Sequence, residues 1–292
     1  MSNQSIRLVK LDFLMQRSSG VSDVVIGLID GPVAMDHPDL ANSHISATGR
    51  GEGACTMASS IACQHGTFVA GILVARRGSL APAICPDCTL LVRPIFPEKT
   101  PNSDGMPAAT PIELAAAIRD VVEAGARIIN LSAALVRPSG VGVQRLQEAL
   151  DFAASRSAIT IAAAGNQGTV GSSAITRHPW VIPVAGCMLD GQPLAESNFG
   201  SSIGRHGLRA PAEQITSLGS DGQPRQFGGT SAAAPFVTGT LALLWSEFRS
   251  ATAVQLKSAL LHLGCTRRAT VVPPLLDAAA AFQSLAATRT YR

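Results

Sequence analysis

Apolar and polar positions follow two periods along the chain, and these periods define the expected elements. Short continuous apolar runs bounded by turn-forming residues are typical of buried strands. They predict strands at 23–30, 89–95, 127–132, 158–164 and 181–185. Longer segments with apolar positions three and four residues apart predict helices at 5–17, 65–76, 111–124, 142–156, 231–248, 252–263 and 275–286. Small residues, glycine and proline predict loops at 41–62, 97–110 and 186–229.

Strands and helices alternate along the chain, which is typical of a parallel sheet covered by helices on both faces. The expected fold is therefore an α/β three-layer sandwich with a mostly parallel central sheet. No repeat, linker or low-complexity tract divides the sequence, so we expect one domain over 1–292, with its core at about 20–286. Ligands of such sheets bind beyond the carboxyl ends of the strands. Three polar residues lie at or just past expected strand ends: Asp30, Ser132 and Asn166.

Three segments carry residues of acyl-transfer chemistry. The run GGTSAAAP at 228–235 brings Ser231 to the start of an apolar helix, where amide N–H groups are unpaired and the helix dipole is positive. An expected strand ends at Asp30, and QHGTFVAGIL at 64–73 places His65 at the head of a helix. Each residue alone could be an ordinary turn or helix cap. Together, in the chain order Asp, His, Ser, they predict a catalytic triad.

The chain resembles the subtilisin-like serine proteases (subtilases, peptidase S8) from about residue 24 to about residue 280. HGTxVAG at 65–71, GTSxAxP at 229–235 and AAAGNQG at 162–168 match the motifs of that family. The resemblance implies a subtilisin-like sandwich and a serine endopeptidase with Asp30, His65 and Ser231 as its triad. It also implies that the side-chain amide of Asn166 and the backbone N–H of Ser231 form the oxyanion hole.

The resemblance further implies how a peptide substrate binds. An extended peptide would pair with exposed backbone edges. One edge would begin at Ser132, and the other would come from the loop around Ala108. The pocket for the residue before the cut would be walled by Ala133, Ala134, Ala163, Ala164 and Gly165. These residues are small and apolar, so their identity fixes no side-chain preference, and plain packing is an alternative reading of Ala133 and Ala134.

Shorter matches point to one branch of the family. DGPV at 30–33, HPDL at 37–40 and RPIF at 93–96 resemble the cyanobactin maturation proteases, which process ribosomally made precursor peptides. That branch contains a leader-cleaving protease and a macrocyclase with a helical insertion that shields its site from water. Asp30 and His65 are only 35 residues apart, which leaves little room for such an insertion. Hydrolysis is therefore expected over transpeptidation. A non-catalytic peptide-binding scaffold is the other alternative, and the complete set of motif residues argues against it.

Composition narrows the partners and the compartment. With 46% hydrophobic and 15% charged residues and a net charge of +3, the chain is typical of a compact globular protein without a nucleic-acid partner. Residues 1–10 lack the apolar core of a signal peptide, and about 20 residues before the first strand are too few for a folding propeptide. No uncharged apolar stretch reaches the length of about 18 residues that a membrane helix needs. We expect a cytoplasmic protein made in active form, and its oligomeric state stays open.

The six cysteines and the acidic residues suggest no cofactor. In a cytosolic chain structural disulfides are not expected. Cys85 and Cys88 have CxxC spacing but precede a strand, whereas a redox motif would open a helix. A zinc site would need two further ligands, for which Cys55 and Cys63 are candidates only if the fold brings them near. Packed or loop thiols are the favoured interpretation. Structural calcium is possible in this family but is not predicted, because no aspartate-rich loop is present.

Overall fold

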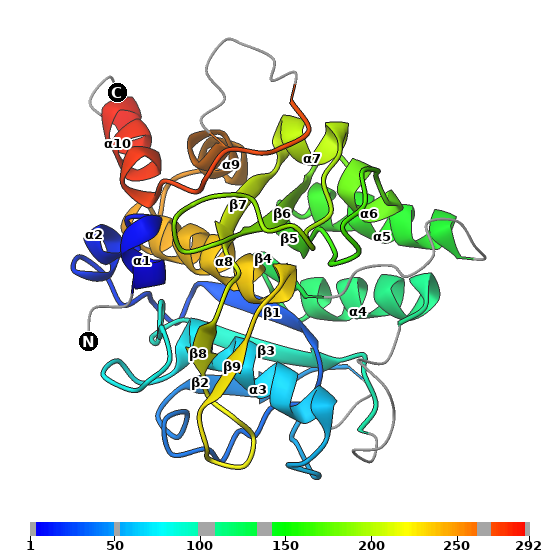
Figure 1. Ribbon diagram of the computed structural model, residues 1–292, viewed down its shortest axis with the longest axis vertical. Helices are drawn as coiled ribbons and strands as arrows, with labels where there is room; N and C mark the ends of the chain where they lie inside the picture. The colour runs from blue at the N-terminus through cyan, green and yellow to red at the C-terminus, as the bar shows by residue number, and fades with distance from the viewer. Residues whose placement is uncertain (1–3, 50–52, 99–108, 133–141, 262–269, 290–292) are drawn as a thin grey trace.

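A seven-stranded sheet forms the centre of the computed structural model, which describes residues 4–49, 53–98, 109–132, 142–261 and 270–289 (Figure 1). Its strand order is β2-β3-β1-β4-β5-β6-β7, and all six pairings are parallel. The strands are β1 (Val25–Asp30), β2 (His44–Ala47), β3 (Thr89–Pro94), β4 (Ile128–Leu131), β5 (Ile159–Ala163), β6 (Val181–Cys187) and β7 (Leu208–Pro211). A separate antiparallel pair joins β8 (Ile215–Ser217) to β9 (Arg225–Phe227). The expected mostly parallel α/β fold is confirmed.

Helices cover both faces of this sheet. Alternate strand residues enter two different apolar clusters. Ile128 belongs to the cluster that holds residues of α3 (Ile61–Val74) and α8 (Thr230–Glu247), and Ile129 belongs to the cluster that holds residues of α4 (Pro111–Glu123) and α5 (Val143–Ser155). This alternation is the two-residue period of a strand buried on both faces. The remaining helices are α1 (Gln4–Leu8), α2 (Leu11–Met15), α6 (Ala174–Arg177), α7 (Ser201–His206), α9 (Ala253–Leu261) and α10 (Ala278–Arg289). None of the described helices is both long and apolar enough to cross a bilayer.

The sheet reverses its winding direction at β1. This strand pairs with β3 on one side and with β4 on the other, so the connections on its two sides run in opposite directions. In parallel sheets ligands bind at the carboxyl ends of the strands at such a reversal. The site is therefore expected beyond Asp30, the last residue of β1.

Three expected elements were wrong in detail. The helix expected at 5–17 is two short helices, because Lys10 between them takes a left-handed conformation with φ 54°. The segment 41–62, expected as a loop, contains the edge strand β2 and the first residues of α3. β2 is mostly exposed and so carries no apolar run. The segment 186–229 holds α7, β7, β8 and β9, which are all too short to show a period.

Two cysteines form a disulfide, which corrects the expectation of packed or loop thiols. Cys55 and Cys63 are bonded, with their Cα atoms 5.5 Å apart and a separation of eight positions in the sequence. Spacing alone could not show this pairing, because it depends on the segment at 53–55 folding against the turn after β1. Cys85, Cys88 and Cys187 are free and buried, as the favoured interpretation expects. Cys265 lies outside the described residues.

Candidate active site

Asp30, His65 and Ser231 meet at the carboxyl end of the sheet. The carboxylate Oδ1 of Asp30 lies 2.7 Å from His65 Nδ1, and His65 Nε2 lies 3.0 Å from Ser231 Oγ. A carboxylate can only accept, so Nδ1 carries the proton and Nε2 is free to accept the serine proton. The three residues come from β1, α3 and α8, and 166 positions separate His65 from Ser231. The sequence expectation that these residues lie together agrees with this geometry.

Two glycines let the histidine helix approach the aspartate turn. A Cβ on Gly31 would lie 2.0 Å from the carbonyl oxygen of Ala62, and a Cβ on Gly66 would lie 2.4 Å from the carbonyl oxygen of Gly31. Both neighbours are backbone atoms, so a side chain at either position would force the two elements apart. The hydroxyl of Thr67 accepts a 2.9 Å hydrogen bond from the backbone N–H of Ala34 and fixes the same contact. His65 is the fifth residue of α3, which begins four residues before the expected start at 65.

The surroundings of His65 act on its pKa in opposite directions. Burial lowers the pKa, while the charge of Asp30 and the hydrogen bond to it raise the pKa, and the net result is a pKa above the ordinary value of 6.5. Asp30 itself is completely buried and also accepts a 2.6 Å hydrogen bond from the backbone N–H of Gly31. Its carboxylate is thus held in place to orient the imidazole and to stabilise the imidazolium.

A threonine that the sequence analysis did not single out positions Asn166. The Oδ1 atom of Asn166 accepts hydrogen bonds from the backbone N–H and the hydroxyl of Thr230, at 2.8 and 3.0 Å. Since Oδ1 must face these donors, the amide Nδ2 is the group left to donate to a ligand. A Cβ on Gly229 would lie 2.8 Å from this Nδ2, and Gly229 has φ 87°, so glycine is required there. The signal was present in the GTS motif, where Thr230 precedes the serine.

Ser231 occupies the first turn of α8, where backbone N–H groups have no acceptor within the helix. Its N–H therefore has no acceptor within the helix, and the bonds at Oδ1 leave the Nδ2 of Asn166 to donate, so both groups are available as donors. This pair of donors matches what an oxyanion requires.

Of the other expected site residues, some lie near the ends of β4 and β5 and others lie outside the described residues. Ser132 follows β4, and its Oγ accepts a 2.8 Å hydrogen bond from Asn130 Nδ2. Ala163 and Ala164 are 4% and 7% exposed, so they offer little surface to a ligand. Gly165 has φ 103° and donates its N–H to the hydroxyl of Thr230 at 3.1 Å. Three expected positions lie outside the described residues: Ala108, Ala133 and Ala134.

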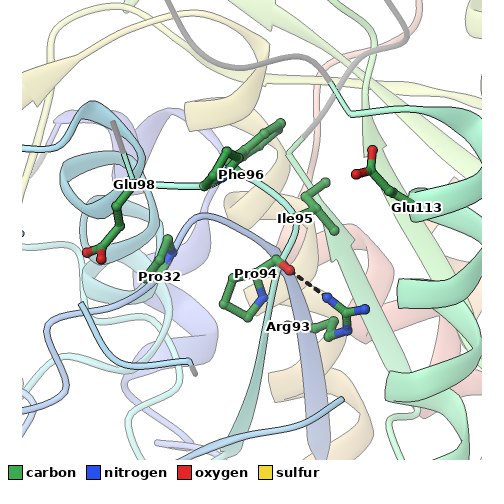
Figure 2. A pocket seen from close by; sticks show the side chains of 8 residues that line it. Pro32, Arg93, Pro94, Ile95, Phe96, Glu98 and Glu113 are labelled. Carbon is green, nitrogen blue, oxygen red and sulfur yellow. Dashed lines mark hydrogen bonds between the residues drawn. The ribbon is translucent and has the colours of Figure 1, made fainter. Parts of the chain in front are cut away.

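A pocket of about 450 Å³ opens beside the carboxyl end of β3 (Figure 2). It is lined by Pro32, Arg93, Pro94, Ile95, Phe96, Pro97, Glu98 and Glu113. Figure 2 shows Glu98 and Pro32 on one side and Glu113 on the other. The Nε of Arg93 pairs with Asp120 at 2.7 Å, so its charge is matched within the protein. Pro32 follows Asp30 by two residues, but Asp30, His65 and Ser231 do not line this pocket.

One group of metal-ligating side chains occurs among the described residues. The ligand atoms of Cys55, Cys63 and Glu98 lie within 4.8 Å of one another. With the two sulfurs bonded to each other, neither is a thiolate, and thiolates are the form that binds metal. The group is therefore a disulfide with a carboxylate beside it in this structure.

The sequence and the fold are similar to those of known proteases. The family model described as the subtilase family, peptidase S8, matches residues 21–271. Subtilisin DY of Bacillus licheniformis is 28% identical over 260 residues, which cover 87% of this chain and 88% of that protein. The solved protease domain of PatA has 30% identity and a TM-score of 0.81, over 92% of this chain and 97% of that one. The solved prenylagaramide maturation protease PagA has 26% identity and a TM-score of 0.80, over 94% and 98%.

Proposed function

Because the chain belongs to the subtilase family, and is a subtilisin-like serine endopeptidase, we propose that Asp30, His65 and Ser231 are its catalytic triad and that it matures a precursor peptide by hydrolysis. One observation carries the assignment of the triad: His65 bridges Asp30 and Ser231 at 2.7 and 3.0 Å. Residues from three separate elements converge there in the geometry that nucleophilic catalysis needs.

Acylation follows from this geometry. Ser231 Oγ attacks the scissile carbonyl while His65 Nε2 takes its proton, and the protonated imidazole then gives that proton to the leaving amine. Asp30 stabilises the imidazolium without taking the proton itself. A water molecule, activated by the same imidazole, hydrolyses the acyl-enzyme and restores the serine. No metal or organic cofactor enters any of these steps.

The oxyanion of the tetrahedral intermediate is held by two donors. These are the Nδ2 of Asn166, which is left free by the two bonds to its Oδ1, and the N–H of Ser231 in the first turn of α8. Such donors are aimed before the reaction begins, so their alignment costs nothing during it. Removing one such donor lowers kcat by about 10²–10³-fold in comparable enzymes, and we expect a loss of this size when the Asn166 amide is removed.

The substrate is a peptide, and we assign its binding to backbone pairing along the edge that begins at Ser132, with Ala108 on the opposite edge. Ala133, Ala134, Ala163, Ala164 and Gly165 form the proposed pocket for the residue before the cut. The positions of Ala164 and Gly165 support their place in this pocket. The N–H of Gly165 donates to the hydroxyl of Thr230, which precedes the proposed nucleophile, and Ala164 directly precedes Gly165 in the chain.

Precursor maturation is supported by the likeness to PagA, which is described as a maturation protease, and to the protease domain of PatA. Hydrolysis rather than ring closure is supported by the segment between the aspartate and the histidine. Between Asp30 and Ile61 the described residues contain the strand β2 and no helix, so nothing there resembles a helical shield over the site.

A single domain and a cytoplasmic location complete the proposal. The one seven-stranded sheet, on which both apolar clusters pack, supports one domain. The location bears directly on the Cys55–Cys63 disulfide, because a reducing compartment keeps most thiols reduced. Thiol trapping in intact cells, followed by fractionation, measures both the location and the state of this bond.

Labelling by a fluorophosphonate, read by intact mass, tests the triad. We expect one adduct on the wild type and none on Ser231→Ala, with equal circular dichroism spectra for the two. A folded wild type without an adduct would overturn the assignment. To test the reaction type, a short precursor peptide is incubated with the enzyme. Hydrolysis gives two products whose masses add up to the substrate mass plus one water, whereas ring closure gives a product without added water.

A further inference from the structure

The Cys55–Cys63 disulfide joins the two elements that bring Asp30 and His65 together. Cys63 is in the first turn of α3, two residues before His65. Cys55 is in a segment that pairs with the turn after β1: its N–H donates to Val33 O, and Val33 N–H donates to Gly53 O, both at 2.9 Å. The bond therefore ties the start of the histidine helix to the segment that holds the aspartate turn.

Glu98 adds a third connection to the same place. Its Oε1 accepts hydrogen bonds from the backbone N–H groups of Thr56 and Met57, at 2.7 and 2.9 Å, and its Oε2 accepts from the Thr56 hydroxyl. Burial raises the pKa of Glu98, but the hydrogen bonds from Thr56 and Met57 outweigh it and hold that pKa below its ordinary value. Glu98 is thus a carboxylate at neutral pH, and it lies on the segment after β3 that lines the pocket.

The same carboxylate is placed to stabilise the reduced state. Glu98 Oε1 lies 2.5 Å from Cys63 Sγ. In the disulfide this sulfur has no proton to donate, whereas the thiol of reduced Cys63 would donate its proton to Glu98. The cluster therefore has two chemically distinct arrangements, an oxidised one with the sulfurs bonded and a reduced one with a thiol held by Glu98.

From these contacts, and resting on the proposed triad, we propose that the Cys55–Cys63 disulfide is a redox-controlled brace of the active site, which a dithiol opens with loss of turnover. A thiolate of the dithiol attacks Cys55 Sγ, because Cys55 is partly exposed and Cys63 is fully buried. The S–S bond breaks and Cys63 leaves, taking a proton from water. The second thiol of the reductant then displaces Cys55, so two electrons pass to the protein disulfide and the dithiol becomes a cyclic disulfide.

Opening the bond frees the first turn of α3 from the segment at 53–57. His65 lies within a turn of that point, and displacements of about 1 Å in a catalytic group can cost up to about 10² in rate. We therefore expect kcat to fall about tenfold or more on reduction, with a smaller change in KM. Cys55 and Cys63 act here as positioning residues, because neither touches the reacting atoms.

The test compares oxidised and dithiol-treated enzyme, with turnover expressed per site titrated by the fluorophosphonate. Counting only titrated sites removes any effect of unfolded protein. We expect a loss that reverses on reoxidation, and a downward shift in the pH midpoint of activity as His65 moves away from Asp30. The double variant Cys55→Ser/Cys63→Ser should have the low turnover permanently and should not respond to dithiol. Equal kcat in the oxidised and reduced wild type would overturn the proposal, as would a dithiol effect that persists in the double variant.

Glu98→Gln is the matched variant for the chemistry of opening. Glutamine keeps acceptor oxygen for Thr56 and Met57 but removes the negative charge beside the leaving sulfur. The carboxylate accepts a hydrogen bond from the neutral Cys63 thiol, but its charge repels the Cys63 thiolate that leaves first. We therefore expect the disulfide of Glu98→Gln to be reduced faster than that of the wild type, and an unchanged or slower rate would contradict this effect of the charge on the leaving sulfur. An oxidised wild type that fails to take the fluorophosphonate would instead overturn the proposed triad, so the two failures are distinct.

Discussion

Thr230 fixes the side chain of Asn166 through one oxygen. Asn166 Oδ1 accepts from both the N–H and the hydroxyl of Thr230, and the same hydroxyl accepts from the N–H of Gly165 at 3.1 Å. The residue before the proposed nucleophile thus sets the direction of the proposed oxyanion donor. A single threonine links the segment after β5 to the start of α8, so the two donors of the proposed oxyanion hole are positioned together.

We expect Thr230→Val to lower kcat about tenfold while leaving KM within about twofold, because it removes the hydroxyl and keeps the N–H that also holds Asn166. Asn166→Ala should lower kcat further, by about 10²–10³. Thr230→Ser keeps the hydroxyl and should retain nearly full turnover. Steady-state kinetics on a cleavable peptide measures all three. A Thr230→Val enzyme with wild-type kcat would show that the backbone N–H alone suffices to orient the amide.

The raised pKa of His65 predicts the acid limb of the activity profile. His65 must be neutral to accept the serine proton, so kcat/KM should rise with pH through a midpoint above 6.5, the ordinary histidine pKa. In Asp30→Asn the carboxylate that raises this pKa is gone while burial still lowers it, so the midpoint should fall, and turnover should drop by about 10⁴. Asp39→Asn is the control, because Asp39 pairs with Arg76 away from the triad. A midpoint that is the same in wild type and Asp30→Asn would contradict the coupling.

The same pKa shift affects stability with a fixed sign. A histidine whose folded pKa is raised stabilises the fold below its unfolded pKa, and this contribution is lost as pH rises through the folded pKa. The stabilisation by the Asp30–His65 pair is therefore present in acid and absent where the enzyme is most active. Activity and this part of the stability are expected to change in opposite directions across the same pH range.

Sequence patterns predicted five of the seven strands of the sheet and singled out the three residues of the proposed triad, because both depend on strong local signals. The buried strands β1, β4, β5 and β6 are continuous apolar runs, and Ser231 stands in a motif that shows its helix start directly. The edge strand β2 could not be predicted, since pairing with β3 and not apolar burial keeps it in the sheet. The role of Thr230 and the Cys55–Cys63 bond depend on contacts across 64 and 8 positions, which no local period reports.

Gly66→Ala should disrupt the site through the backbone. Its Cβ would lie 2.4 Å from Gly31 O and 2.5 Å from Pro32 O, so α3 must move away from the aspartate turn. We expect kcat to fall at least about tenfold and the protein to lose about 1–3 kcal/mol of unfolding free energy, as overpacking typically costs. Gly171→Ala is a matched control, because a Cβ there meets nothing within 4 Å. Denaturant unfolding and fluorophosphonate labelling rates measure the two effects, and a Gly66→Ala protein that labels at the wild-type rate would refute the close-approach argument.

The Cys55–Cys63 bond should also add global stability. In the loop-entropy model, a disulfide between residues eight positions apart lowers the entropy of the unfolded chain and so raises the free energy of unfolding by about 2.5 kcal/mol. The double variant Cys55→Ser/Cys63→Ser should therefore unfold at lower denaturant, and reducing the wild type should produce a loss of similar size. The reduction should have no further effect on the double variant. If reduction destabilises that variant as well, the loss in the wild type cannot be assigned to this bond.

Lys257 gives the last prediction, because it is a buried lysine of α9 that is only 8% exposed. Its Nζ donates to Pro179 O at 2.5 Å and lies 4.8 Å from the centre of the Trp180 ring, and burial lowers its pKa from 10.5 to about 8. A lysine with a depressed folded pKa takes up a proton on unfolding, so its stabilising contribution is present above pH 10.5 and is lost as pH falls to about 8. The shift corresponds to about 3 kcal/mol.

Relative to the wild type, Lys257→Met should therefore be more stable near pH 7 than near pH 10, when unfolding free energies are compared at the two pH values. Lys10→Met, at an exposed lysine paired with Asp277, is the control and should show no such pH-dependent difference. A constant difference between wild type and Lys257→Met across this range would mean that Lys257 remains charged in the folded protein.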